Sequence, residues 1–265
     1  MRLARKAAGL CLAAGLLVSC AHGPARDGDE GDKAAKAWSR GSRTAAPERS
    51  DARGEKLAAE SFRLFKSAES VRMTRTSGVG KASLLMDRAG NCTGTYDAGP
   101  MKRAEVIVVT GHGGEGAAYV RYTAEALAEI LDEAERRGPA TEAKVKPRVE
   151  LIRGKYLELP DPEGKFARQC DLQAGARTLP FETEGVEAGA PTVRHGVRVI
   201  PLTGMGEGGD TLYVAAEGAP YMRFVVVESG GEMRFSDYGE PVRAEVPPAH
   251  LVVEADDMAG GLLAA

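Results

Sequence analysis

From residue 57 onward, apolar and polar residues follow each other at the spacings of short helices and strands. The first helical face is formed by Leu57, Ser61, Leu64, Phe65 and Ala68. A second helix is expected over residues 123–137, because Thr123 can cap its first turn and Gly138 with Pro139 ends it. A third, shorter helix is expected over 162–172.

Ten short segments read as strands, separated mostly by glycine-rich turns. They are 71–77, 81–87, 92–97, 102–110, 117–122, 150–159, 192–202, 210–217, 221–228 and 232–236. Successive strands joined by short turns pair antiparallel, so the pattern predicts an α+β fold. A sheet of this many strands tends to curl. We therefore expect a strongly curved antiparallel sheet, or half-barrel, with helices covering its concave face and an apolar cavity between the two layers.

The N-terminal segment has the features of a bacterial export signal. Arg2, Arg5 and Lys6 precede an apolar run over 7–18 that is too short for a good membrane span. The run ends in Leu17-Val18-Ser19-Cys20, which resembles the lipobox of bacterial lipoproteins. This resemblance implies cleavage before Cys20, a diacylglycerol thioether on its thiol, and an anchor on the outer face of the cell membrane. The alternative is an ordinary cleaved signal with a chance cysteine.

The rest of the chain divides by composition. Residues 1–19 are the expected signal peptide, and 20–54 are small, polar and charged, so we expect a lipidated, disordered tether. A flexible tether of this length spans roughly 30 Å. The half-barrel domain is expected over 55–255, followed by a flexible tail over 256–265.

Cysteine use follows from this processing. Cys11 leaves with the signal peptide and Cys20 carries lipid, so Cys92 and Cys170 remain in an oxidising compartment. We predict a disulfide between them. A metal or redox site is the weaker alternative, because the sequence has no CxxC and no nearby histidine that completes a ligand set.

Charge and motifs argue against several other classes of function. The formal net charge is −3, and loss of Arg2, Arg5 and Lys6 makes the processed chain more acidic, which does not favour nucleic-acid binding. The glycine runs at 111–116 and 204–209 follow strands, but no helix start or Lys-Ser/Thr pair follows them, so hairpin loops are expected. The four histidines lack metal-binding spacings. No catalytic residue, metal or cofactor is expected, and the chain is not expected to be an enzyme.

Several short segments resemble actinobacterial cell-envelope lipoproteins, namely the mycobacterial lipid-carrying lipoproteins, whose fold is similar to that of the periplasmic lipoprotein-localisation carriers. The segments are Ser70-Val71-Arg72, Asn91-Cys92-Thr93-Gly94, Tyr119-Val120-Arg121, Cys170-Asp171-Leu172, Leu212-Tyr213-Val214-Ala215, Gly218-Ala219-Pro220-Tyr221 and Phe235-Ser236-Asp237-Tyr238-Gly239 with Pro241-Val242. The resemblance covers about residues 57–248. It implies a cavity for acyl chains and a role in moving or sensing envelope lipids.

The leading hypothesis is therefore an anchored lipoprotein that binds, and transfers, a lipid or other apolar ligand. Five residues on neighbouring strands are predicted to share one face and line the cavity: Met222, Phe224, Val226, Met233 and Phe235. The alternative is that these five residues belong to a closed hydrophobic core with no cavity. The rival hypothesis is an envelope interaction or sensor module without a ligand, and a cavity of a few hundred Å³ would favour lipid binding over it.

Overall fold

The computed structural model of the chain describes residues 48–111, 116–161, 165–174, 182–205, 209–228 and 230–254. The N-terminal processing site, the glycine-run residues 112–115 and 206–208, and the predicted tail lie outside these ranges. All described residues belong to one compact unit, residues 45–265. This unit contains the three apolar cores described below, so we expect it to fold on its own.

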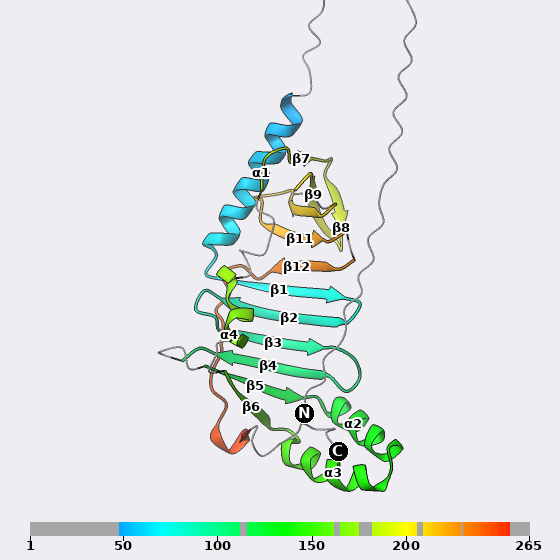
Figure 1. Ribbon diagram of the computed structural model, residues 1–265. Coiled ribbons are helices and arrows are strands. Elements are labelled where there is room, and N and C mark those ends of the chain that lie inside the picture. Colours follow the sequence, from blue (N-terminus) through cyan, green and yellow to red (C-terminus); the bar gives the residue numbers. More distant parts are fainter. Residues whose placement is uncertain are drawn as a thin grey trace, which may run out of the picture. The chain divides into compact units, whose positions relative to one another are not determined.

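Within the described ranges, thirteen strands form one mixed, mostly antiparallel sheet (Figure 1). They are β1 (Ser70–Ser77), β2 (Gly80–Asp87), β3 (Cys92–Asp97), β4 (Arg103–Val109), β5 (Gly116–Tyr122), β6 (Tyr156–Asp161), β7 (Glu187–Ala188), β8 (Thr192–Arg194), β9 (Val197–Thr203), β10 (Thr211–Ala215), β11 (Met222–Val226), β12 (Glu232–Ser236) and β13 (Val252–Glu254). The order across the sheet is β13-β6-β5-β4-β3-β2-β1-β12-β11-β10-β9-β7, and β8 also pairs with β9.

Two meanders of hairpins make up the sheet, and one long-range pairing joins them. β1 to β5 pair in succession, as do β9 to β12. β1 then pairs with β12, which brings residues near 72 beside residues near 236. The described strands do not close into a ring: β13 and β7 remain at opposite edges. The predicted α+β class with a curved, open sheet is confirmed.

Helices pack on the sheet as α1 (Glu48–Ser67), α2 (Ala124–Arg136), α3 (Pro139–Ile152), the short α4 (Lys165–Cys170) and the 3-10 turn η1 (Ala249–Leu251). Figure 1 shows α1 along the β7–β12 half, α4 over the β2–β5 half, and the α2–α3 pair at the β6 end. Thr123 caps α2 as expected, because its hydroxyl accepts a hydrogen bond from the Ala126 amide at 3.2 Å.

The first core lies between α1 and the β9–β12 meander. Phe62 and Phe65 of α1 pack there with Met222, Val225 and Phe235 of the sheet. Helix α1 begins at Glu48, so the predicted tether over 20–54 is wrong for residues 48–54. This segment has few aliphatic residues, but it is helical and packs against β7. At Gly54 an added Cβ would lie 2.0 Å from the Val186 carbonyl oxygen, so the close approach of helix and strand requires glycine.

The second core lies under α2 and α3 and corrects another prediction. The strand expected over 150–159 begins only at Tyr156, because the residues before it belong to α3. Val145, Val149 and Ile152 are buried on one side of α3 at helical spacing. Pro147 lies inside this helix, although proline removes a backbone hydrogen bond there. Similarly, the strand expected over 192–202 is a hairpin of β8 and β9, and its two-residue turn has positive φ at His195 and Gly196.

Candidate functional site

A pocket of about 440 Å³ lies on the sheet face that α4 covers. Its floor comes from β4 and β5, where Val106, Val108, Ala118 and Val120 point to one side at alternating positions. The side walls come from β1, β2 and β3. Helix α4 supplies the remaining wall. These other lining residues are Arg75, Ser77, Val79, Gly80, Lys81, Ala82, Leu84, Tyr96, Phe166, Gln169 and Cys170.

Burial differs strongly between the two ends of this pocket. At the α4 end, Val108, Ala118 and Cys170 are buried in the third apolar core together with Met86 and Cys92. At the opposite end, the side chain of Val79 is 83% exposed and that of Tyr96 is 45% exposed. The pocket is therefore closed by core residues at the α4 end and has a solvent-exposed rim at the β1–β2 turn.

The closed end is fixed by a disulfide between Cys92 of β3 and Cys170 of α4. The turn before Cys92 is organised by Asp87, whose carboxylate accepts hydrogen bonds from the Ala89 amide at 2.8 Å and the Asn91 amide at 2.9 Å. The side-chain carbonyl of Asn91 in turn accepts from the amide and hydroxyl of Thr110. These contacts hold Cys92 in place, and the disulfide then ties α4 to the sheet.

Small residues in the wall strands leave room for the pocket. Ala82 and Ala118 line it where larger side chains would fill it. In β3, an added Cβ on Gly94 would lie 1.9 Å from the Ser83 carbonyl oxygen, so only glycine allows this close approach of β2 and β3. Glycine at this position is thus a backbone requirement of the sheet beside the pocket.

The five residues predicted to line a cavity lie elsewhere and do not share one face. Tyr213 pairs with Phe224 and Val214 with Met222, so Arg223 is an extra residue in β11, a β-bulge. The bulge reverses the alternation, and Val225 rather than Phe224 and Val226 shares the α1 core with Met222, Met233 and Phe235. Phe224 packs instead near His195 and Tyr213. None of the five lines the 440 Å³ pocket, and the prediction of a shared lining face is wrong.

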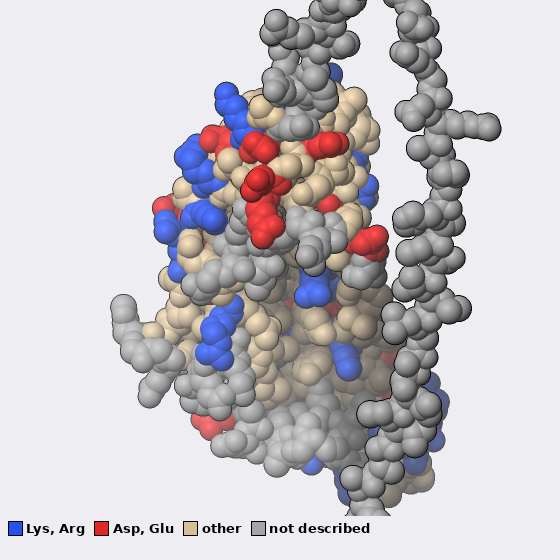
Figure 2. Space-filling model, turned by 45° about the horizontal axis from the view of Figure 1, so that its top comes forward, with Lys and Arg blue, Asp and Glu red and all other residues tan. Residues whose placement is uncertain are grey.

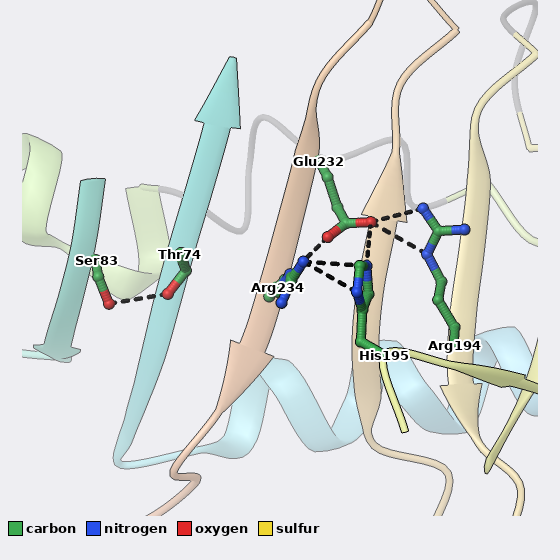
Figure 3. Close-up of polar contacts among 6 residues, drawn as sticks. All are labelled: Thr74, Ser83, Arg194, His195, Glu232 and Arg234. Carbon is green, nitrogen blue, oxygen red and sulfur yellow. Dashed lines mark hydrogen bonds and ion pairs between the residues drawn. The ribbon is translucent and has the colours of Figure 1, made fainter. Parts of the chain in front are cut away.

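On the other face of the sheet, Glu232 is the centre of a polar cluster (Figure 3). Its carboxylate accepts hydrogen bonds from Arg194 at 2.6 Å and from Arg234 at 2.6 Å, and the His195 ring nitrogen Nε2 lies 3.1 Å away. Arg194 also stacks over the Tyr213 ring at 4.9 Å. Partial burial raises the pKa of the Glu232 carboxyl, but the hydrogen bonds from Arg194, Arg234 and His195 outweigh it and hold this pKa at about 2. The cluster fastens the β8–β9 turn to β12.

Replacing Glu232 with glutamine is expected to lower the free energy of unfolding by roughly 1–2 kcal/mol at neutral pH. This is less than the pKa shift alone would give, because the arginines contact solvent, which screens the ion pairs. The folded pKa lies below the ordinary value of 4.5, so the stabilisation is full above that pH and is lost as the pH falls towards about 2. Urea denaturation at several pH values measures it. The matched control is Glu217→Gln, which removes the exposed pair with Arg198 and should change little. A native–variant difference that persisted at pH 2 would contradict this explanation.

No group of three or more His, Cys, Asp or Glu residues in the described parts of the chain is placed to hold a metal ion. Among the helices in those parts, none is long and apolar enough to cross a membrane.

The sequence analysis did not identify the residues that line the pocket, although the pattern of the strands that carry them was recognisable. Val106 and Val108 belong to the β-branched run that predicted β4, and Ala118 and Val120 alternate in β5. What the sequence did not show is that α4 covers these strands without filling the space above them. The small side chains of Ala82 and Ala118 are the clue that could have pointed to this half of the sheet.

The fold and the pocket define a class: α+β proteins with a curved, open antiparallel sheet and an apolar pocket beneath a covering helix. Neither a protein-family model nor a curated protein sequence matches the chain. Among solved structures, LprF from Mycobacterium bovis is similar, with a TM-score of 0.50 and 11% identity, covering 76% of this chain and 99% of LprF. Lipoprotein LppX from Mycobacterium tuberculosis matches with a TM-score of 0.41 and 12% identity, covering 74% of this chain and 100% of LppX. The likeness to LprF shows a shared fold, as the resemblance to mycobacterial lipoproteins implied.

Proposed function

We propose that the protein is an extracytoplasmic lipoprotein, anchored through Cys20, that binds a lipid or other apolar ligand in the pocket under α4 and transfers it within the cell envelope. The observation that carries the proposal is the pocket itself, about 440 Å³ in volume and walled mainly by Val, Leu, Ala, Tyr and Phe side chains. Ligand sites in proteins are typically about 300–1,000 Å³ and mostly apolar. The volume thus favours lipid binding over a ligand-free interaction module.

The chemistry of the lining matches that of an acyl chain. Such a chain forms no hydrogen bonds, so it needs only an apolar wall of adequate length. Of the lining residues, Arg75 and Lys81 are charged, and both belong to the β1–β2 end, away from the core residues Val108, Ala118 and Cys170. A bound amphiphile would place its chain towards α4 and its polar group towards Arg75 at the exposed end.

Two independent features support the anchor and the location of this activity. The Leu17-Val18-Ser19-Cys20 motif follows a basic and then an apolar segment, as in lipoprotein signals. The fold shared with LprF agrees with the resemblance to mycobacterial lipoproteins that the sequence motifs indicated. A lipid-anchored domain of this kind meets apolar ligands at the membrane to which it is tied.

Filling the pocket tests the proposal. Ala82→Trp places an indole in the pocket wall, and we expect it to weaken binding of a fluorescent fatty-acid probe by at least about tenfold, because the lost apolar contact is worth more than about 1.4 kcal/mol. Titration of the 45–265 unit with the probe measures the dissociation constant. Circular dichroism and urea denaturation verify that the variant is folded.

The matched control is Thr95→Trp on β3. Thr95 is exposed and alternates with the pocket residue Tyr96, so its side chain points to the opposite face of the sheet. This variant should bind the probe as the native unit does. Equal binding by all three proteins, or no binding by the native unit, would favour the ligand-free interaction module instead.

A further inference from the structure

The rim of the pocket exposes two large hydrophobic side chains to solvent. Val79 occupies the turn between β1 and β2 and is 83% exposed, and Tyr96 of β3 is 45% exposed. Both residues line the pocket. Two other valines, Val193 and Val246, are also largely exposed, but neither belongs to the pocket lining. The rim therefore differs from scattered surface valines in being continuous with an apolar interior.

Two cations flank this apolar rim. Arg75 of β1 points to the pocket face, whereas Lys81 of β2 alternates with the pocket residue Ala82, so its side chain belongs to the opposite face at the same end of the strands. Neither forms an ion pair with another residue in the described ranges. The acidic residue opposite Lys81 in the strand register is Asp97, and it is already paired with Arg103 at 3.4 Å. Over the α1 end of the surface seen in Figure 2, by contrast, basic and acidic side chains lie beside one another. The rim thus offers local positive charge to an anionic partner.

We propose that this rim is a membrane-contact surface, which touches a bilayer containing anionic lipids. In this arrangement Val79 enters the interfacial region, Tyr96 lies at headgroup level, and Arg75 and Lys81 contact lipid phosphates. Tyrosine prefers this interface, and each basic residue near an anionic surface adds attraction. The further consequence rests on the proposed function: an apolar ligand passes between bilayer and pocket without being exposed to water.

The chemistry of the rim favours a bilayer over a protein partner. The apolar part is small, formed by Val79 and Tyr96, while stable protein interfaces bury about 800 Å² or more on each partner and are depleted of lysine. A bilayer needs only shallow insertion and accepts long basic side chains whose charged ends reach the phosphates. Because the rim is continuous with the pocket, a ligand can move between a bilayer and the pocket at this contact, whereas a protein bound there would block the entrance.

Vesicle binding tests the proposal. The 45–265 unit, without the lipid anchor, is mixed with sucrose-loaded phosphatidylcholine vesicles that do or do not contain phosphatidylglycerol, and bound protein is measured by sedimentation. We expect binding that increases with phosphatidylglycerol. Val79→Asp should weaken it by about tenfold, because a carboxylate replaces a side chain that enters the interface. The double variant Arg75→Gln with Lys81→Gln should lose most of the dependence on phosphatidylglycerol.

The matched control is Val193→Asp, which changes a valine that is 67% exposed but lies outside the pocket lining. It should bind vesicles as the native unit does. The proposal is overturned if the native unit does not bind these vesicles, or if Val79→Asp and Val193→Asp have equal effects. Probe binding by the native unit in vesicle-free solution separates the two proposals: a unit that binds the probe but not the vesicles overturns the membrane contact alone, and a unit that binds the vesicles but not the probe overturns the proposed function alone.

Discussion

Replacing both Cys92 and Cys170 with alanine is expected to lower the free energy of unfolding by about 4–5 kcal/mol. The disulfide joins residues 78 positions apart, so it restricts a long loop of the unfolded chain. Both cysteines are buried in the third core, and the replacement also removes sulfur atoms from that packing. Urea denaturation of the 45–265 unit measures the loss.

The same change should affect ligand binding. Helix α4 has six residues and contributes Phe166, Gln169 and Cys170 to the pocket wall. A helix this short is not stable alone, so it depends on its attachment to β3. We expect the double variant to bind a fatty-acid probe several-fold more weakly, even under conditions where the sheet stays folded. In excess reductant, the native unit and the variant should become similar in stability. A variant within about 1 kcal/mol of the native unit under oxidising conditions would contradict this role of the disulfide.

The second large effect is expected for Phe65→Ala in α1, at about 3–5 kcal/mol. Phe65 is 2% exposed, and its ring meets the Phe235 ring edge-to-face with centroids 5.4 Å apart. Truncation removes this contact and leaves a cavity between α1 and the β9–β12 meander. Urea denaturation measures the loss, with the half-buried Leu64→Ala as the smaller-effect control.

Phe65→Ala also separates stability from ligand binding. The pocket is lined by β1 to β5 and α4, and neither α1 nor the β9–β12 meander contributes to it. Probe affinity should therefore stay close to native at low denaturant, in contrast to the cysteine variant. A large loss of probe affinity with folding intact would show that the α1 core and the pocket are coupled, against this account.

Local features of the fold were readable from the sequence because they depend on nearby residues. The hairpin turns, the Thr123 cap and the strands β1 to β5 follow from glycines, capping chemistry and alternating side chains. Local sequence patterns could not predict the pairing of β1 with β12, since it joins segments more than 150 residues apart. Helix α3 was not predicted, because Pro147 is unfavourable inside a helix. The packing of Val145 and Val149 in the second core nevertheless stabilises the helix.

The candidate site was predicted less well, and the reasons are structural. A single extra residue, Arg223, changes the faces of Phe224 and Val226, and alternation alone cannot reveal a bulge. The pocket depends on where α4 lies, and α4 is placed by the Cys92–Cys170 bond rather than by its own sequence pattern. The cysteine pair was the sequence feature that pointed most directly to the position of α4.

The central claim is that the pocket under α4 holds an apolar ligand, and mass spectrometry of the protein purified from its own cell envelope tests it most directly. The native chain is isolated under mild conditions, extracted with organic solvent, and compared with Ala82→Trp prepared in the same way. The account predicts an acyl-chain lipid in near-stoichiometric amount from the native protein and little from the variant. A native protein that yields no lipid, or a variant that yields as much as the native protein, would contradict it.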